Sequence, residues 1–140
     1  MKTFQTSREF NCAPESIFEA IANSGRLARW WGPNEFSNTF HTFEFKPGGK
    51  WIFTMNGPDG TNYPNESEFL EIIPSEKIVI RHVCPPFFTL TIRIEETENG
   101  SIVYWLQDFD SEEVAEMVAH IVIPANEENL DRLAAEIEKN

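Results

Sequence analysis

Two hydrophobic periods divide the chain into strand-like and helix-like parts. Between residues 3 and 109, apolar and polar side chains alternate over short runs, the period of two expected for half-buried strands. The predicted strands cover residues 3–11, 36–45, 50–55, 66–73, 77–83, 88–94 and 102–109. Gly, Pro and Asn residues separate these runs, as in the Asn-Gly pair at 99–100. The pattern therefore predicts a sheet of antiparallel strands.

The C-terminal residues carry a helical period instead. Leu130, Leu133, Ala134 and Ile137 recur at i, i+3, i+4 and i+7 and form one apolar stripe. Pro124 suits the first turn of a helix, where its missing N–H costs nothing. We therefore expect one long helix from Pro124 to the end of the chain, with its apolar stripe on the sheet.

Three shorter helical segments are also predicted. Pro14 begins one after the first strand, and residues 26–29 form a second before the Gly-Pro stop at 32–33. Ser111 is suited to cap a third, at residues 112–119. Strands and helices are segregated rather than alternating, which predicts an α+β fold, here as one domain over residues 1–140.

Composition narrows the classes of function. The net charge of −12 repels phosphate backbones, so we expect no nucleic-acid partner. No apolar run approaches the roughly 20 residues of a membrane span, so no membrane insertion is expected. Strand-like residues begin at Phe4 without a signal-peptide leader, and two cysteines make no disulfide framework, which predicts a cytoplasmic protein. The twelve Phe and four Trp residues suffice for a core or for the lining of an apolar pocket.

Sequence motifs occur in a specific order along the chain. They are APESIFEAI at 13–21, LARWWGP at 27–33, FKPGGKW at 45–51, EFLEIIPSEKIV at 68–79 and PANEENLDRL at 124–133. In this order they resemble the START-like superfamily, also called SRPBCC, in the branch named for the activator of the heat-shock-protein-90 ATPase. The resemblance implies a helix-grip fold: a bent seven-stranded antiparallel sheet around the long C-terminal helix, with a cavity between them.

The chemistry-bearing residues show no pattern of an established catalytic or metal site. Spacings typical of metal ligands, phosphate loops and nucleophile elbows are missing, so we expect no catalytic residue, no metal and no cofactor. His82 continues the apolar face of its strand and could orient a ligand, move a proton or be a satisfied core histidine. His41 has the same readings, and Cys84 is either a reactive thiol at a pocket mouth or a simple half-buried thiol.

The predicted ligand cavity is lined by side chains on the apolar faces of these elements. They are Trp30, Trp31, Phe43, Trp51, Phe53, Met55, His82, Trp105, Phe109 and Leu133. Three functions fit this pattern: binding of a small hydrophobic or aromatic ligand, a polyketide cyclase-like or hydrolase-like enzyme that uses a cavity His or carboxylate, and a chaperone-interaction module. The ligand binder is favoured, as a monomer or homodimer, with a chaperone as a further expected partner.

Overall fold

The computed structural model describes residues 2–139, which form seven strands and three helices. In chain order they are β1 (Thr3–Phe10), α1 (Pro14–Ala22), α2 (Ser24–Trp30), β2 (Ser37–Phe43), β3 (Lys50–Asn56), β4 (Asn62–Ile73), β5 (Lys77–His82), β6 (Phe88–Thr97), β7 (Gly100–Phe109) and α3 (Glu112–Glu138).

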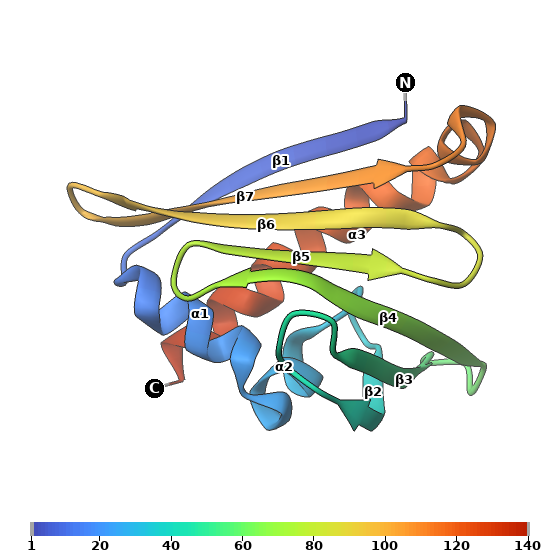
Figure 1. The fold of residues 1–140 in the computed structure, drawn as a ribbon, viewed down its shortest axis with the longest axis horizontal. Helices are drawn as coiled ribbons and strands as arrows, with labels where there is room; N and C mark the ends of the chain where they lie inside the picture. Colours follow the sequence, from blue (N-terminus) through green and yellow to red (C-terminus); the bar gives the residue numbers. More distant parts are fainter. Residues whose placement is uncertain (1, 140) are drawn as a thin grey trace.

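The strands form one antiparallel sheet in the order β1-β7-β6-β5-β4-β3-β2. Strands β2 to β7 each pair with their neighbour in sequence, whereas β1 pairs with β7. Strands β1 and β2 therefore form the two edges, and α3 crosses behind the sheet (Figure 1). This arrangement confirms the predicted α+β fold with a seven-stranded antiparallel sheet and a long C-terminal helix.

Two register shifts help to curve the sheet. One lies between Phe40 and Thr42 in the pairing of β2 with β3, and the other lies between Phe69 and Glu71 in the pairing of β4 with β5. An extra residue in one strand bends that strand and increases the local twist. The curvature gives the sheet a concave face on the side of α3.

Local sequence explains the two short helices. Pro14 lies in the first turn of α1, where no N–H partner is needed, and Glu15 suits the positive end of the helix dipole. Asn23 separates α1 from α2 and caps α2, because its side chain accepts a hydrogen bond from the backbone N–H of Arg26. The indole N–H of Trp30 donates to the carbonyl of Ala20 at 3.0 Å, which ties the two helices together.

The predicted start of the C-terminal helix at Pro124 is wrong. Helix α3 runs without a break from Glu112, capped by Ser111 as expected, so Pro124 lies in its interior. Proline there removes the bond to the carbonyl four residues earlier, that of His120. Pro124 and His120 are both exposed, so water can solvate that carbonyl. Tertiary packing of the turns on either side of Pro124 stabilises the helix, so it continues through the proline.

The strand predicted at 66–73 begins earlier, at Asn62. The added residues include Pro64, which sequence rules place at strand edges because proline cannot donate to a neighbouring strand. In this stretch β4 pairs only with β3, since its pairing with β5 begins at Ser67 opposite His82. Pro64 is thus on a locally free edge, which reconciles it with a strand.

The core lies between the concave face of the sheet and the helices. The stripe predicted for α3 is confirmed, since Leu130 and Leu133 are fully buried and Ala134 and Ile137 pack against the core. The burial of alternate strand residues is confirmed too, as in Ile78, Ile80 and His82 of β5.

Replacing Leu133 with Ala should lower the free energy of unfolding by about 2–5 kcal/mol, because a buried leucine leaves a cavity that the surroundings fill only in part. Urea unfolding followed by circular dichroism measures the loss. Met117→Ala, on an exposed position of the same helix, is the matched control and should change stability by less than about 0.5 kcal/mol. Equal losses in the two variants would contradict the burial of the stripe.

Candidate functional site

A cavity of about 230 Å³ lies between the sheet, the segment that follows α2, and α3. It is lined by Trp31, Gly32, Pro33, Phe53, Met55, Asn65, Ser67, Ile80, His82, Pro86, Phe88, Leu90, Gln107 and Asn129. A larger hollow, of about 430 Å³, lies between α1 and the end of α3, but charged side chains such as Glu19 and Glu138 line it. The smaller cavity is therefore the better candidate for a ligand, because apolar walls with a few polar groups are typical of ligand sites.

Strand register brings the cavity residues together. Phe53 of β3 lies opposite Asn65 of β4, and Ser67 of β4 lies opposite His82 of β5. Phe88 of β6 lies opposite His82 in turn, and the two rings stack with centroids 4.5 Å apart. Directly opposed side chains share a face of a sheet. Asn65 and Ser67 are two residues apart on β4, so these two rows of side chains lie on the same face of the sheet and form one wall of the cavity.

One cavity residue presents a polar group that has no partner. Asn129 is 8% exposed, and its Oδ1 accepts a hydrogen bond from the backbone N–H of Gly32 at 2.8 Å. A backbone N–H can only donate, so this contact fixes the orientation of the amide and leaves Nδ2 as the free end. Within residues 2–139, Nδ2 makes no hydrogen bond. Asn129 thus offers the cavity a hydrogen-bond donor.

Two further polar residues line the cavity. Gln107, 9% exposed, uses Oε1 to accept from Asn126 at 3.2 Å, and Ser67 is 3% exposed. Their remaining polar atoms, the Gln107 amide nitrogen and the Ser67 hydroxyl, have no hydrogen-bond partner in the described part of the chain. The cavity therefore offers its occupant the amide N–H₂ groups of Gln107 and Asn129, which donate, and the hydroxyl of Ser67, which both donates and accepts.

His82 is a buried, hydrogen-bonded member of the wall. Its Nδ1 lies 2.7 Å from the carbonyl of Pro86, and its Nε2 lies 2.8 Å from Oδ1 of Asn65. Burial lowers the pKa of His82 below its usual range, against the smaller raising effect of the Pro86 carbonyl. Both partners are oxygen atoms that accept, so each ring nitrogen faces an acceptor, while burial opposes the charged form of the ring that would donate to both.

The segment after α2 forms the rim of the cavity, and Arg132 of α3 holds it in place. The guanidinium donates to the backbone carbonyls of Arg29, Trp31, Gly32, Pro33 and Phe36, at 2.7–3.2 Å. Gly32 also needs to be glycine, because its φ is +97° and a Cβ would lie 2.7 Å from the terminal methyl carbon of Met55. These contacts place Trp31 and Pro33 against the cavity.

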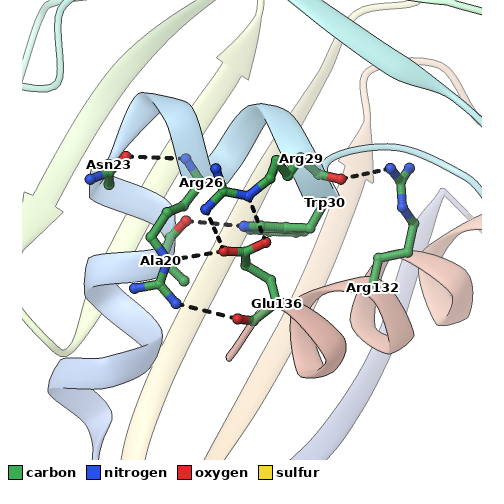
Figure 2. Close-up of polar contacts among 7 residues, drawn as sticks. All are labelled: Ala20, Asn23, Arg26, Arg29, Trp30, Arg132 and Glu136. Atoms are coloured by element: carbon green, nitrogen blue, oxygen red, sulfur yellow. Dashed lines mark hydrogen bonds and ion pairs between the residues drawn. The ribbon is translucent and has the colours of Figure 1, made fainter. Parts of the chain in front are cut away.

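A buried carboxylate anchors the helix that precedes this rim. Glu136 is 2% exposed and accepts hydrogen bonds from Arg29 at 2.8 and 3.0 Å and from Arg26 at 3.1 Å. Figure 2 shows Glu136 between the two arginines of α2, with Arg132 one turn earlier on α3 pointing to the carbonyl of Arg29. The hydrogen bonds from Arg29, followed by those from Arg26, lower the pKa of Glu136 against the raising effect of burial.

The residues predicted to line the cavity fall into two groups. Trp31, Phe53, Met55 and His82 line it. The others pack in the interior beside it: Trp30, Phe43, Trp51, Trp105, Phe109 and Leu133. The reason is the size of the tryptophans, which fill the space near the middle of the sheet. Trp31 contacts Trp51 and Trp105 with ring centroids 5.0 and 5.7 Å apart.

The polar residues of the wall are not evident from the sequence pattern. Asn65, Ser67, Gln107 and Asn129 were not among the predicted lining residues, although Gln107 shares the strand face of Trp105. The available signal was a polar residue at a position where the alternation of the strand predicts burial, as at Ser67 and Gln107. A polar residue in such a position needs a partner, and an unfilled need indicates a site.

The architecture and the sequence of the chain match those of a known protein family. The curved sheet around a long C-terminal helix is the helix-grip architecture. The profile of the family described as Activator of Hsp90 ATPase homolog 1-like protein matches residues 11–138, and the chain belongs to this family. No curated protein matches the chain.

Solved structures of bacterial proteins share the fold. A protein from Arthrobacter aurescens is 25% identical with a TM-score of 0.90, over 99% of this chain and 87% of that chain. A protein from Nitrosomonas europaea is 16% identical with a TM-score of 0.88, over 98% of this chain and 94% of that chain. The AHSA1 protein from Silicibacter pomeroyi is 19% identical with a TM-score of 0.80, over 97% of each chain.

Two features of the described residues bear on other classes of function. Among residues 2–139, no three or more His, Cys, Asp or Glu side chains are grouped so that they could hold a metal ion. None of the helices within the same range is both long and apolar enough to span a membrane.

Replacing Glu136 with Gln should lower the free energy of unfolding at pH 7 by about 1.5–3 kcal/mol, the range for hydrogen bonds to charged groups. The folded-state pKa of Glu136 lies below the ordinary value of 4.5. Its stabilisation is therefore complete above that value and is lost as the pH falls through the lower folded-state pKa. The gap between wild type and variant in urea unfolding should shrink as the pH is lowered below 4.5.

Glu138→Gln is the matched control for this measurement, because Glu138 is exposed on the same helix. This control should unfold at the wild-type urea concentration at pH 7. A Glu136→Gln variant as stable as the control would show that the contacts with Arg26 and Arg29 contribute nothing to folding.

Proposed function

We propose that the protein binds a small, uncharged and largely apolar ligand that carries a hydrogen-bond acceptor such as a carbonyl group. The observation that carries this proposal is the buried amide of Asn129, whose Oδ1 is committed to Gly32 while Nδ2 has no partner in the described chain. Nδ2 is not among the fully buried side-chain atoms that lack a partner, so it is open to the contents of the cavity. A ligand carbonyl there would accept a hydrogen bond from this donor.

The lining and the volume of the cavity favour an uncharged ligand about the size of one ring. Among residues 2–139, no Asp, Glu, Lys or Arg side chain lines the cavity, so a charged group would lose its hydration without gaining a partner. The volume of about 230 Å³ is below the range typical for drug-sized ligands, about 300–1,000 Å³, and above the roughly 150 Å³ that holds benzene. Phe53, Met55 and Leu90 supply apolar contacts.

Acetophenone and ethylbenzene test this proposal, since they match in size and differ in the carbonyl. We expect acetophenone to bind about 5- to 10-fold more tightly, the equivalent of one net hydrogen bond of about 1–1.5 kcal/mol. Amide chemical-shift titrations measure both affinities. Asn129→Asp keeps an acceptor for Gly32 and removes the donor, so this preference should disappear.

Cavity-filling variants provide the control. Leu90→Trp puts bulk into the cavity and should weaken binding of both probes, whereas Thr91→Trp, on the other face of the same strand, should not. Circular dichroism checks that each variant is folded. Equal affinity of the wild type and the folded Leu90→Trp variant would place binding elsewhere and refute the proposal.

A second candidate function is contact with a chaperone, which the family name suggests and which exposed apolar side chains favour. Met117 and Ile121, one turn apart on α3, are 73% and 57% exposed. Large apolar side chains exposed side by side favour contact with another protein. If this candidate holds, the wild type should accelerate ATP hydrolysis by purified Hsp90, and the Met117→Glu/Ile121→Glu variant should not. No acceleration by either protein would argue against it.

A further inference from the structure

Three polar groups that face the cavity come from two separate parts of its wall. They are the amide nitrogens of Gln107 and Asn129 and the hydroxyl of Ser67, on residues that are 9%, 8% and 3% exposed. Within residues 2–139 these groups make no hydrogen bond, and none of them is among the fully buried atoms that lack a partner. Each is therefore open to the cavity. A buried polar side chain without a partner is uncommon in a folded protein and indicates a site.

The two amides lie close together on the α3 side of the cavity. Asn126 donates to Oε1 of Gln107 at 3.2 Å, which leaves the nitrogen of Gln107 as the free end. Asn126 and Asn129 are three residues apart on α3, so their side chains are neighbours on one face of the helix. The free nitrogens of Gln107 and Asn129 are thus near one another. A carbonyl oxygen has two lone pairs, so one ligand carbonyl can accept from both.

Ser67 lies on the other side of the cavity. Gln107 is on β7 and Ser67 is on β4, which are three strand spacings apart in the sheet. The row of paired residues that starts at Gln107 passes through Leu90 and Ile80 and reaches β4 at Phe69, two residues from Ser67. At about 4.8 Å per spacing, the two strands are about 14 Å apart along the sheet. The gap between the polar ends is shorter, because both side chains point into the same hollow.

Apolar side chains form the wall between the two polar ends. Leu90 and Ile80 come from the intervening strands β6 and β5 and line the cavity. His82 lies opposite Ser67, but both of its ring nitrogens are already within hydrogen-bond distance of protein oxygens. The cavity thus presents a pair of donors, an apolar middle and a hydroxyl, in that order.

We infer that the ligand is an aromatic ketone or aldehyde with a hydroxyl group at the para position of its ring. The inference rests on the proposed function and narrows the class of ligand. The carbonyl accepts from Asn129 and Gln107, the ring packs on Leu90, and the ligand hydroxyl forms a hydrogen bond with Ser67. A para-substituted ring with an oxygen at each end, and a hydrogen bond of about 2.8 Å at each oxygen, spans about 12 Å. That length is within the separation of β4 and β7.

Matched ketones test the role of the ligand hydroxyl. 4-Hydroxyacetophenone and 4-methylacetophenone are nearly equal in size and share the carbonyl group. We expect the wild type to bind the hydroxyl compound about 5-fold more tightly, the ratio that one net hydrogen bond gives. Isothermal titration calorimetry measures both affinities. 3-Hydroxyacetophenone should show no such gain over 3-methylacetophenone, because its hydroxyl group is not directed at the Ser67 end.

Variants assign each end of the ligand to its residue. Ser67→Ala removes the hydroxyl with little change in volume and should bind the two para compounds equally. Ser7→Ala, at an exposed position of β1, is the matched control and should keep the wild-type preference. Gln107→Met should weaken both para compounds by the same factor and keep the preference, because both carry the carbonyl that Gln107 would bind.

Nuclear magnetic resonance reports the orientation of the bound ligand. In the complex with 4-hydroxyacetophenone, the acetyl methyl group should give nuclear Overhauser effects to the side-chain N–H₂ protons of Asn129 or Gln107. The ring protons beside the hydroxyl should give them to Ser67. The opposite set of contacts would refute the assigned ends.

The outcomes separate this inference from the proposed function. Wild-type protein that binds both para compounds with equal affinity would refute the anchor at Ser67 and leave the ligand site in place. A preference that persists in the folded Ser67→Ala variant would refute it too. If the wild type binds neither acetophenone nor the para compounds, the proposed function fails, and the inference fails with it.

Discussion

A polar stripe on one side of α3 is the constraint on which the cavity depends. Asn129, Arg132 and Glu136 lie three and four residues apart, so their side chains emerge on one face of the helix. Together they bind α2 and the segment that follows it, through the backbone at 29–36 and the side chains of two arginines. The neighbouring apolar stripe fixes α3 on the sheet, whereas this polar one fixes the cavity rim on α3. Apolar contacts are non-directional, so the first stripe only holds α3 against the sheet. Hydrogen bonds are directional, so the second stripe also sets the position of the rim.

The polar stripe matters because the rim has little secondary structure of its own. Between the end of α2 and the start of β2, Arg132 donates to the carbonyls of Trp31, Gly32 and Pro33. Those of Trp31 and Pro33 also accept from Asn38 and from the backbone of Phe36, respectively. The planar guanidinium of Arg132 can serve several acceptors at once. The rim then holds Trp31 between the tryptophan cluster and the cavity. Trp51 and Trp105 have buried indole N–H groups with no acceptor in the described chain, so the aromatic packing is favourable enough to leave them unpaired. Space remains only where smaller side chains, such as Ser67, interrupt this packing.

The fold could be predicted from the sequence because its determinants are local and periodic. Alternation placed Ile78, Ile80 and His82 on one buried face, and the helical period of about 3.6 residues placed Leu130 and Leu133 on another. The interior position of Pro124 could not be predicted, since the preference of proline for a first turn was overridden by tertiary packing. The composition of the cavity could not be predicted either. It depends on which residues the strand register places side by side, as it does Ser67 and His82. It also depends on where the large tryptophans leave room.

The position of Asn129 links the fold to the proposed site. One end of its amide holds the rim through Gly32, and the other end is left for the cavity, so a single side chain shapes the wall and supplies its polar group. Any ligand group that bonds to Nδ2 polarises the amide and strengthens the bond at Oδ1, because hydrogen bonds in a chain reinforce one another. Binding and rim order are then coupled without a change of fold. Glu136 lies two turns further along the same helix, where it holds α2. In the proposed site, Glu136 would act on a bound ligand through the rim, so the affinity of the cavity should respond to contacts that lie outside it.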